Sequence, residues 1–346
     1  MGVQLLKRVN VSFSVNVLPL SLEMYLSQQL ITNSLPVAFS LNEQTVNVSI
    51  TASSVKPTQK TIELVVFQEL TLQQLLALQQ ASNITITSLN TINTRNDQTS
   101  CRFSINCNNY INSRKAVAQF ALENNIEAAL LNDVPQLSQP GLLVMDMDST
   151  TIEIECIDEI AKLAGVGEQV SEVTERAMLG ELDFSESLHQ RVATLAGSSE
   201  NILADVVENI PLMSGLESLI TELKKHNWRI AIASGGFTYF ADHLKTSLGL
   251  DAAFANTLEI INGRLTGKVL GDVVDAQVKA DSLAVLSKKY QIDASQTVAM
   301  GDGANDLVMM AAASFGVAFH AKPIVLAQAD ASINSQGLDC LLHWLA

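Results

Sequence analysis

The sequence predicts a doubly wound parallel α/β sheet with an inserted helical cap, preceded by a smaller α+β domain. Two observations predict the sheet: short, continuous apolar runs recur after residue 140, and segments with helical spacing separate them. Continuous apolar runs are typical of strands buried on both faces of a parallel sheet, and their alternation with helices is typical of α/β folds. A third observation, the mixture of β-rich and leucine-rich segments before residue 135, predicts the α+β domain.

The N-terminal domain, residues 1–135, carries strand-like and helix-like segments and no obvious catalytic residue. Alternation or β-rich composition predicts strands, and leucine spacing predicts a helix. The predicted strands are Val11–Leu18, Thr61–Phe67 and Ile84–Leu89, and the predicted helices are Leu70–Gln80 and Arg114–Asn124. Strand, helix and strand repeated in this manner are typical of a ferredoxin-like α+β domain. Polar stretches at 40–60 and 90–113 are expected to be loops or hairpins.

The second domain, residues 136–346, is expected to hold the doubly wound, Rossmann-like sheet. Its predicted strands are Gly141–Met145, Arg229–Ala233, Thr297–Met300 and Phe315–Phe319, and its predicted helices include Leu216–Lys225, Ala280–Tyr290 and Asp306–Ala313. The interval between the first two strands is too long for one crossover helix. Residues from about 157 to 212 are largely helical in pattern and polar, so we interpret them as a cap inserted over the edge of the sheet.

Composition bounds the class of protein. The chain has 346 residues, of which 47% are apolar and 16% charged, which is typical of a globular chain with two or three domains. No apolar run reaches the roughly 18 residues of a membrane span. The N-terminus alternates polar and apolar residues and lacks the apolar core of a secretory signal, so a cytoplasmic location is expected.

The net charge of −15 argues against nucleic acids and anionic membranes as partners, because an acidic surface repels both. An anionic substrate then needs a local reversal of the field, by a metal ion and well-placed cations. The four cysteines form no CxxC pair and the five histidines do not cluster, so no zinc site is expected and the thiols are interpreted as reduced.

Three of the predicted strands are each followed directly by a polar, turn-forming cluster. The clusters are Asp146-Met-Asp148-Ser-Thr, Ser234-Gly-Gly, and Gly301-Asp302-Gly-Ala-Asn305-Asp306. In open α/β sheets, ligands bind outside the carboxyl ends of the strands. We therefore expect the three clusters to converge on one site.

The first cluster supplies paired carboxylates. A DxD pair is also found in surface turns, loop caps and unrelated metal sites, but here it follows a buried strand, where alternate side chains share a face. Two carboxylates so close repel each other, and one of them needs a cation or a proton. We predict that Asp146 stays ionised beside Mg²⁺ as the nucleophile, and that Asp148 carries a proton as the general acid.

The other motifs supply a metal ligand and phosphate-binding groups. Asp302, Asp146 and the backbone carbonyl of Asp148 would satisfy Mg²⁺, which needs few protein carboxylates; a calcium-type or simple turn is the alternative. Ser234 precedes a predicted helix, whose exposed N–H groups suit a phosphate, although a plain loop has the same pattern. Lys279 opens a predicted helix, where the macrodipole disfavours a cation. Neutralising a phosphate would explain this lysine, and a solvated lysine is the alternative.

From about residue 141 to 335, the motifs in this order resemble the haloacid-dehalogenase-like superfamily of phosphotransferases. Two stretches are more specifically similar to the phosphoserine phosphatase family. These are Asp146–Glu155 (DMDSTTIEIE) and Glu175–Arg191 (ERAMLGELDFSESLHQR). The resemblance implies a phosphatase that releases serine from O-phosphoserine, the last step of serine biosynthesis, through an aspartyl phosphate.

The same resemblance implies a role for each matching residue. Asp146 would be phosphorylated, Asp148 would be the general acid and base, and Mg²⁺ would sit on Asp146, Asp302 and the carbonyl of Asp148. The groups holding the phosphoryl oxygens would be Ser234, Gly235, Lys279 and Asn305, with Asp306 orienting Lys279. Glu155 suits the substrate's ammonium group and Arg191 its carboxylate. Met178 and Phe184 would close over the substrate, and for these two residues a core role is the alternative.

The N-terminal domain is similar, in its order of strands and helices, to the ACT-like extensions of some bacterial phosphoserine phosphatases. This implies amino-acid sensing or formation of a homodimer, and a structural appendage is the alternative. Two rival functions fit the catalytic region: a phosphatase of the same fold acting on another small phosphate ester, and a binding protein with a retired active site. Retention of both aspartates of the DxD pair, Lys279 and Asp302 argues against the second. A dehalogenase would need neither Asp148 nor the metal ligands.

Overall fold

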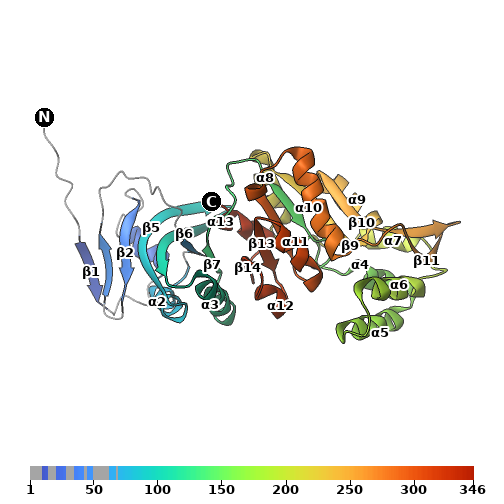
Figure 1. Cartoon of the computed structure of the whole chain (residues 1–346), viewed down its shortest axis with the longest axis horizontal. Helices are drawn as coiled ribbons and strands as arrows, with labels where there is room; N and C mark the ends of the chain where they lie inside the picture. The colour runs from blue at the N-terminus through green and yellow to red at the C-terminus, as the bar shows by residue number, and fades with distance from the viewer. Residues whose placement is uncertain (1–9, 15–20, 29–34, 43–44, 50–61, 68) are drawn as a thin grey trace. The chain divides into compact units, whose positions relative to one another are not determined.

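The computed structural model describes residues 10–14, 21–28, 35–42, 45–49, 62–67 and 69–346. The chain divides into two compact units, of which one comprises Met1–Val134 with Asp330–Ala346 and the other comprises Pro135–Ala329 (Figure 1). No helix among the described residues is long and apolar enough to cross a bilayer. The cytoplasmic location stays a prediction.

The first unit is built on an antiparallel sheet with the strand order β1-β3-β2-β5-β6-β4-β7. Its strands are β1 (Asn10–Ser14), β2 (Val37–Leu41), β3 (Thr45–Ser49), β4 (Glu63–Phe67), β5 (Ile84–Arg95), β6 (Gln98–Cys107) and β7 (Ala128–Leu131), and its helices include α1 (Leu22–Gln28), α2 (Leu72–Ala81) and α3 (Tyr110–Glu123). From β4 onward the order is strand, helix, strand, strand, helix, strand, which is the order of a split βαβ domain. The remainder of the predicted strand Val11–Leu18, beyond residue 14, lies outside the described residues.

The first unit also repeats one strand–helix–strand–strand pattern. The β1-β3-β2 order matches β4-β6-β5 when the elements are taken in chain order. The residues before the two helices agree as well, because Ser21 and Thr71 each accept the backbone N–H three residues later, at 3.1 Å. The same two residues form an antiparallel bridge. This duplication is not apparent in the sequence, because few residues other than leucines and glutamines recur.

The C-terminal segment Asp330–Ala346, which sequence analysis places with the second domain, clusters with the first unit. Buried Arg102 donates to the carbonyls of His343 and Trp344, at 3.0 and 3.1 Å. Glu127 accepts the backbone N–H groups of residues 334–336. These polar contacts satisfy buried backbone groups that a sequence pattern does not reveal. The segment holds β14 (Ala331–Ile333) and α13 (Leu341–Trp344).

The second unit contains the predicted parallel sheet. Within this unit the strand order is β11-β10-β9-β8-β12-β13, and every described pair is parallel except β10 with β11. The strands are β8 (Leu142–Met145), β9 (Arg229–Phe237), β10 (Ala252–Ile261), β11 (Arg264–Leu270), β12 (Thr297–Gly301) and β13 (Phe315–Phe319). The α/β fold predicted from the apolar runs is therefore confirmed. The β10–β11 hairpin was not predicted, although Asn262-Gly263 at its turn is a hairpin signal.

Helices cover the sheet and form the cap. Between the strands lie α8 (Leu216–Lys225), α9 (Thr238–Leu248), α10 (Ala276–Tyr290), α11 (Leu307–Ala312) and α12 (Pro323–Leu326). The interval between β8 and β9 folds as α4 (Cys156–Ala164), α5 (Gly167–Met178), α6 (Phe184–Thr194) and α7 (Asn201–Val207), before α8. Figure 1 shows α5 and α6 as a pair outside the layers of the sheet and its covering helices. Residues 157–212 are therefore largely helical, and the assignment of this segment as a cap stays a prediction.

The strand order places a crevice at the end of β8. The next strand in the chain, β9, lies on one side of β8, and β12 lies on the other. The direction of winding therefore reverses between β8 and β12. In doubly wound sheets, such a reversal separates the following loops and opens a binding site at the carboxyl ends of the strands.

Candidate active site

The register of the sheet brings the three polar clusters together. Met145 on β8 lies opposite Ile232 on β9 and Met300 on β12. Met145, Met300 and Ile232 therefore lie at one level of the sheet, and the polar residues that follow these three positions share one edge. Asp146 continues this register, because its N–H donates to the carbonyl of Met300 at 2.9 Å.

Lys279 binds the first aspartate directly. Its Nζ lies 2.8 Å from Oδ2 of Asp146 and 2.8 Å from Oδ1 of Asp306, and its side chain is 1% exposed. Asp275 caps α10 by accepting the N–H of Val278, so the lysine lies on the buried face of the first turn. Burial would lower the pKa of Lys279, but the attraction of Asp146 and Asp306 outweighs burial and raises it. A buried cation therefore faces the carboxylate of Asp146.

Asp148 has the surroundings of a protonated acid. Its Oδ1 is buried and has no hydrogen-bond partner among the described residues. Burial raises the pKa of Asp148 well above its ordinary value, and the charges of Glu155 and Asp146 raise it further. The two members of the DxD pair thus differ: Asp146 is paired with a cation, and Asp148 is not.

The acidic groups fit a divalent cation. Carboxylate oxygens of Asp146, Asp302 and Asp306 lie within 4.8 Å of one another. Both oxygens of Asp306 are already engaged, one by Lys279 at 2.8 Å and the other by the N–H of Gly303 at 3.0 Å. Burial, followed by the charges of Asp146 and Glu155, raises the pKa of Asp302 to about 6. A hard cation relieves such crowding of carboxylates. Asp146 and Asp302 line the cavity, so they are the carboxylates placed to hold it.

The end of β9 presents backbone and hydroxyl groups. Buried Ser234 accepts the N–H of Gly236 at 2.9 Å. A Cβ on Gly235 would lie 2.6 Å from the ring of Phe184. The end of β9 and the start of α6 therefore approach each other closely at this glycine. The strand continues to Phe237, four residues beyond its predicted end.

Asn256 is a positioning residue that the sequence analysis missed. It is buried on β10, its Nδ2 donates to the carbonyl of Gly235 at 2.8 Å, and its Oδ1 accepts the N–H of Val274 at 2.8 Å. It therefore ties the end of β9 to the segment that leads into α10. An asparagine within an apolar strand is the only signal in the sequence that could have found it.

The cap side carries the predicted head-group residues. Glu155 lies directly before α4 and accepts the hydroxyl of Ser149 at 2.8 Å. Arg191 is in the last turn of α6, and its buried Nε has no hydrogen-bond partner among the described residues. Phe184 opens α6. Met178 ends α5, and its side chain lies outside the described residues.

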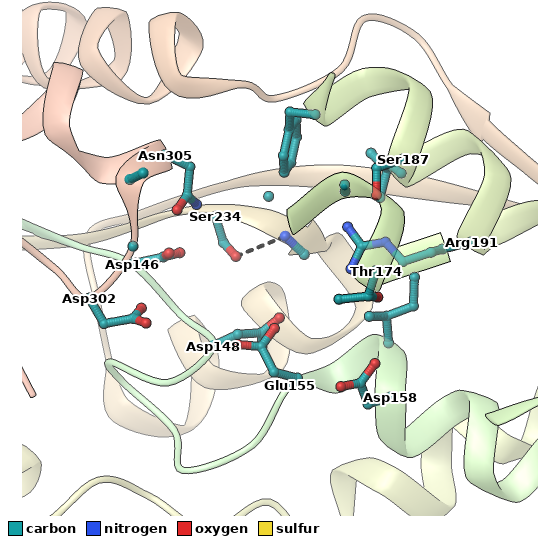
Figure 2. Close-up of a pocket in the computed structure, with 18 of the residues that line it drawn as sticks. Asp146, Asp148, Glu155, Asp158, Thr174, Ser187, Arg191, Ser234, Asp302 and Asn305 are labelled. Carbon is teal, nitrogen blue, oxygen red and sulfur yellow. Dashed lines mark hydrogen bonds between the residues drawn. The ribbon is translucent and has the colours of Figure 1, made fainter. Parts of the chain in front are cut away.

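These groups line one cavity of about 480 Å³. Its lining includes Asp146, Asp148, Glu155, Phe184, Arg191, Ser234, Gly235, Asp302 and Asn305. Figure 2 shows the carboxylates of Asp146 and Asp302 near Ser234, with Arg191 across the cavity. Asp158 also lines it, three residues after Glu155. This helical spacing could have revealed Asp158 in the sequence. A cavity of this size and polarity suits a small, charged molecule.

Comparison with known proteins gives a consistent result. A model of the haloacid dehalogenase-like hydrolase family matches residues 141–314. A phosphoserine phosphatase of Vibrio cholerae is 60% identical over 213 residues, which cover 62% of this chain and 65% of that protein. The match thus spans slightly less than two thirds of the relative's length.

Two solved structures are similar. The unliganded crystal structure of a probable phosphoserine phosphatase from Vibrio cholerae is 47% identical, with a TM-score of 0.70, and the match covers 82% of this chain and 86% of that one. A structure of a phospho-aspartyl intermediate analogue of phosphoserine phosphatase is 39% identical, with a TM-score of 0.57. That match covers 60% of this chain and 100% of the other.

Proposed function

Because this chain belongs to the phosphoserine phosphatase family of haloacid dehalogenase-like hydrolases, we propose that it hydrolyses O-phosphoserine to serine and phosphate. One observation carries the proposal: one end of a cavity is lined by carboxylates, one of which pairs with a buried lysine behind it, and the other end offers an arginine and two further carboxylates. The first set suits a phosphate and the second an amino-acid head group. Release of serine would place the reaction at the end of serine biosynthesis.

In the proposed mechanism, Oδ of Asp146 attacks phosphorus and the bond from phosphorus to the serine oxygen breaks. Asp148 gives its proton to that leaving oxygen, which its raised pKa favours at neutral pH. Water then attacks the aspartyl phosphate and gives a proton to Asp148. Phosphate leaves, and both aspartates return to their starting states. The solved analogue of a phospho-aspartyl intermediate in a relative supports this route.

The phosphoryl group carries negative charge on three oxygens during transfer. Lys279, the hydroxyl of Ser234, the N–H of Gly235 and the amide of Asn305 are proposed to hold these oxygens. Bound Mg²⁺, held by Asp146, Asp302 and the backbone carbonyl of Asp148, would neutralise charge on the phosphoryl group. The ion pair with Lys279 keeps the carboxylate of Asp146 oriented while the substrate enters.

Recognition of the amino-acid head is proposed for the cap. Glu155 would bind the ammonium group, and Arg191 would bind the carboxylate through two parallel hydrogen bonds. Met178 and Phe184 would cover the substrate with apolar surface and keep water away while Asp146 is phosphorylated. The contact between Phe184 and the Gly235 loop supports a cap that closes against the sheet.

The direct test is phosphate release from a panel of phosphorylated amino acids and sugar phosphates, with and without Mg²⁺. We expect phosphoserine to be the best substrate and EDTA to remove the activity. Preference for a sugar phosphate would support the rival phosphatase instead. No release from any ester in the presence of Mg²⁺ would support the binding protein with a retired site.

The dependence on Mg²⁺ is expected to change with pH. The pKa of Asp302 is raised to about 6. Below that pH, the metal-free protein holds a proton on Asp302, and Mg²⁺ must displace this proton to bind. Below pH 6 the Mg²⁺ concentration for half-maximal activity should rise about tenfold per pH unit, for one competing proton. Above pH 7 it should be constant. Titrations of Mg²⁺ from pH 5 to 8 measure this, and a constant value throughout would contradict the assignment of Asp302.

Arg191→Ala is expected to lower kcat/KM for phosphoserine about 100-fold, because a charge-assisted pair of hydrogen bonds is lost. Phosphate esters without a carboxylate should lose less than about threefold. Arg176→Ala is the matched control, since Arg176 is a cap arginine that pairs with exposed Glu181. Equal losses for both kinds of ester would show that Arg191 supports the cap and not the recognition of serine.

For the first unit we propose an ACT-like domain that binds a free amino acid and supports a homodimer. The order of its strands and helices supports the proposal. Calorimetric titration of the full chain with serine, together with sedimentation at several concentrations, tests both parts. A monomer that binds no amino acid outside the active site would refute it.

A further inference from the structure

Ser187 is a buried hydroxyl that the proposed mechanism does not use. It lies on α6, its side chain is 3% exposed, and it lines the cavity. Its Oγ has no hydrogen-bond partner among the described residues. Figure 2 shows it on the cap side of the cavity, beside Arg191. A buried hydroxyl without a partner is unfavourable, so its retention needs a reason.

Neighbouring hydroxyls do not share this property. Thr174, which lines the same side of the cavity, donates to the carbonyl of Val170 at 3.0 Å. Ser234, at the opposite end, accepts the N–H of Gly236 at 2.9 Å. A hydroxyl on a helix commonly binds the carbonyl one turn earlier, as Thr174 does. Ser187 is therefore the cavity hydroxyl that still requires a partner.

The second unsatisfied group lies one helical turn away. Ser187 and Arg191 are four residues apart, so they share one face of α6. The buried Nε of Arg191 also lacks a partner among the described residues. Two hydrogen-bond donors on one face of α6 thus lack an acceptor among the described residues, which indicates that a ligand provides it.

The acceptors across the cavity define the ligand. Glu155 and Asp158, at the start of α4, line the same cavity and offer two carboxylates. An ammonium group would be attracted to them, and a carboxylate would be repelled. Donors on α6 and acceptors on α4 therefore match the two ends of a zwitterion, with its carboxylate on the α6 side.

We propose that Ser187 is a substrate-binding residue whose hydroxyl donates a hydrogen bond to the carboxylate of phosphoserine, beside Arg191. This assignment rests on the proposed function and adds a residue that selects for the amino-acid head. Ser187 already lines the cavity, and its hydroxyl has no competing partner among the described residues.

The test compares Ser187→Ala with the parent protein on two substrates, O-phosphoserine and O-phosphoethanolamine. These differ only by the carboxylate. We expect kcat/KM for phosphoserine to fall about 10- to 100-fold, the usual effect of one hydrogen bond to a charged group. For phosphoethanolamine the change should be less than twofold. Ser185→Ala is the matched control, because this serine on the same helix bonds His189 and does not line the cavity.

Thermal unfolding separates binding from support of the fold. Without ligand, Ser187→Ala should melt within about 2 °C of the parent protein or above it, since no hydrogen bond within the chain is lost. A lower Tm with equal losses on both substrates would overturn the assignment, and so would an unchanged preference for phosphoserine. If the parent protein itself showed no preference for phosphoserine, the proposed function would fail, and the assignment of Ser187 would fail with it.

Discussion

Asp146→Asn is expected to lower kcat for phosphoserine by at least about ten-thousand-fold, the order of loss seen when an enzyme loses its nucleophile. The amide of asparagine has nearly the shape of the carboxylate but cannot form the aspartyl phosphate. Its carbonyl oxygen can still accept a hydrogen bond from Lys279, which now lies 2.8 Å from Oδ2 of Asp146. The variant should therefore fold, and the loss should be chemical.

Two measurements check this expectation. Phosphate release under saturating Mg²⁺ gives kcat, and acid quenching followed by mass spectrometry detects phosphorylated protein during turnover. The parent protein should show the phosphorylated species and Asp146→Asn should not. Asp242→Asn is the control, because Asp242 is exposed on α9 and pairs with Lys245. Activity above about 1% of the parent value in Asp146→Asn would place the nucleophile elsewhere.

Lys279→Met is expected to cause the largest loss of stability of any substitution in the site. The change leaves Asp146 and Asp306 buried and close together without their cation. Removal of one partner from a buried ion pair costs about 3–5 kcal/mol. Urea unfolding in EDTA measures this free energy without compensation by a metal. Turnover should also fall at least about 100-fold, because the phosphoryl oxygens lose a cation.

A second substitution distinguishes charge from packing. Adding Asp306→Asn to Lys279→Met removes one of the unpaired carboxylates, so we expect part of the stability to return while the activity stays low. Lys288→Met, at an exposed position near the end of the same helix, should change the free energy of unfolding by less than about 0.5 kcal/mol. If the double variant were no more stable than Lys279→Met, packing of the lysine chain would be its main contribution.

An acidic protein can bind an acidic substrate only where its field is reversed locally. The net charge of −15 would repel phosphoserine, the proposed substrate, from most of the surface. Lys279 offsets only one of the two charges of Asp146 and Asp306, so a bound divalent cation would complete the reversal at that end. Arg191 on α6 supplies positive charge at the other end. Glu155 and Asp158 keep the field negative where the proposed substrate is cationic.

The sequence alone was sufficient for the elements that depend on local patterns. Continuous apolar runs predicted β8, β9, β12 and β13, because a strand buried on both faces can hold few polar side chains. The polar clusters directly after these strands predicted where a site would lie, because parallel strands place their carboxyl ends on one edge. The position of Lys279 at the start of a predicted helix, where the macrodipole disfavours a cation, predicted that it neutralises a phosphate.

The tertiary structure decided what depends on contacts between distant residues. Only the register of β8, β9 and β12 shows that their three polar clusters lie at one edge of the sheet. Three further findings depend on long-range contacts. Lys279 bridges Asp146 and Asp306, and Asn256 holds the end of β9. The segment Asp330–Ala346 clusters with the first unit. The unsatisfied hydroxyl of Ser187 is likewise visible only once its surroundings are known. A local sequence pattern indicates the environment that a residue needs. The folded structure determines which distant residue provides that environment.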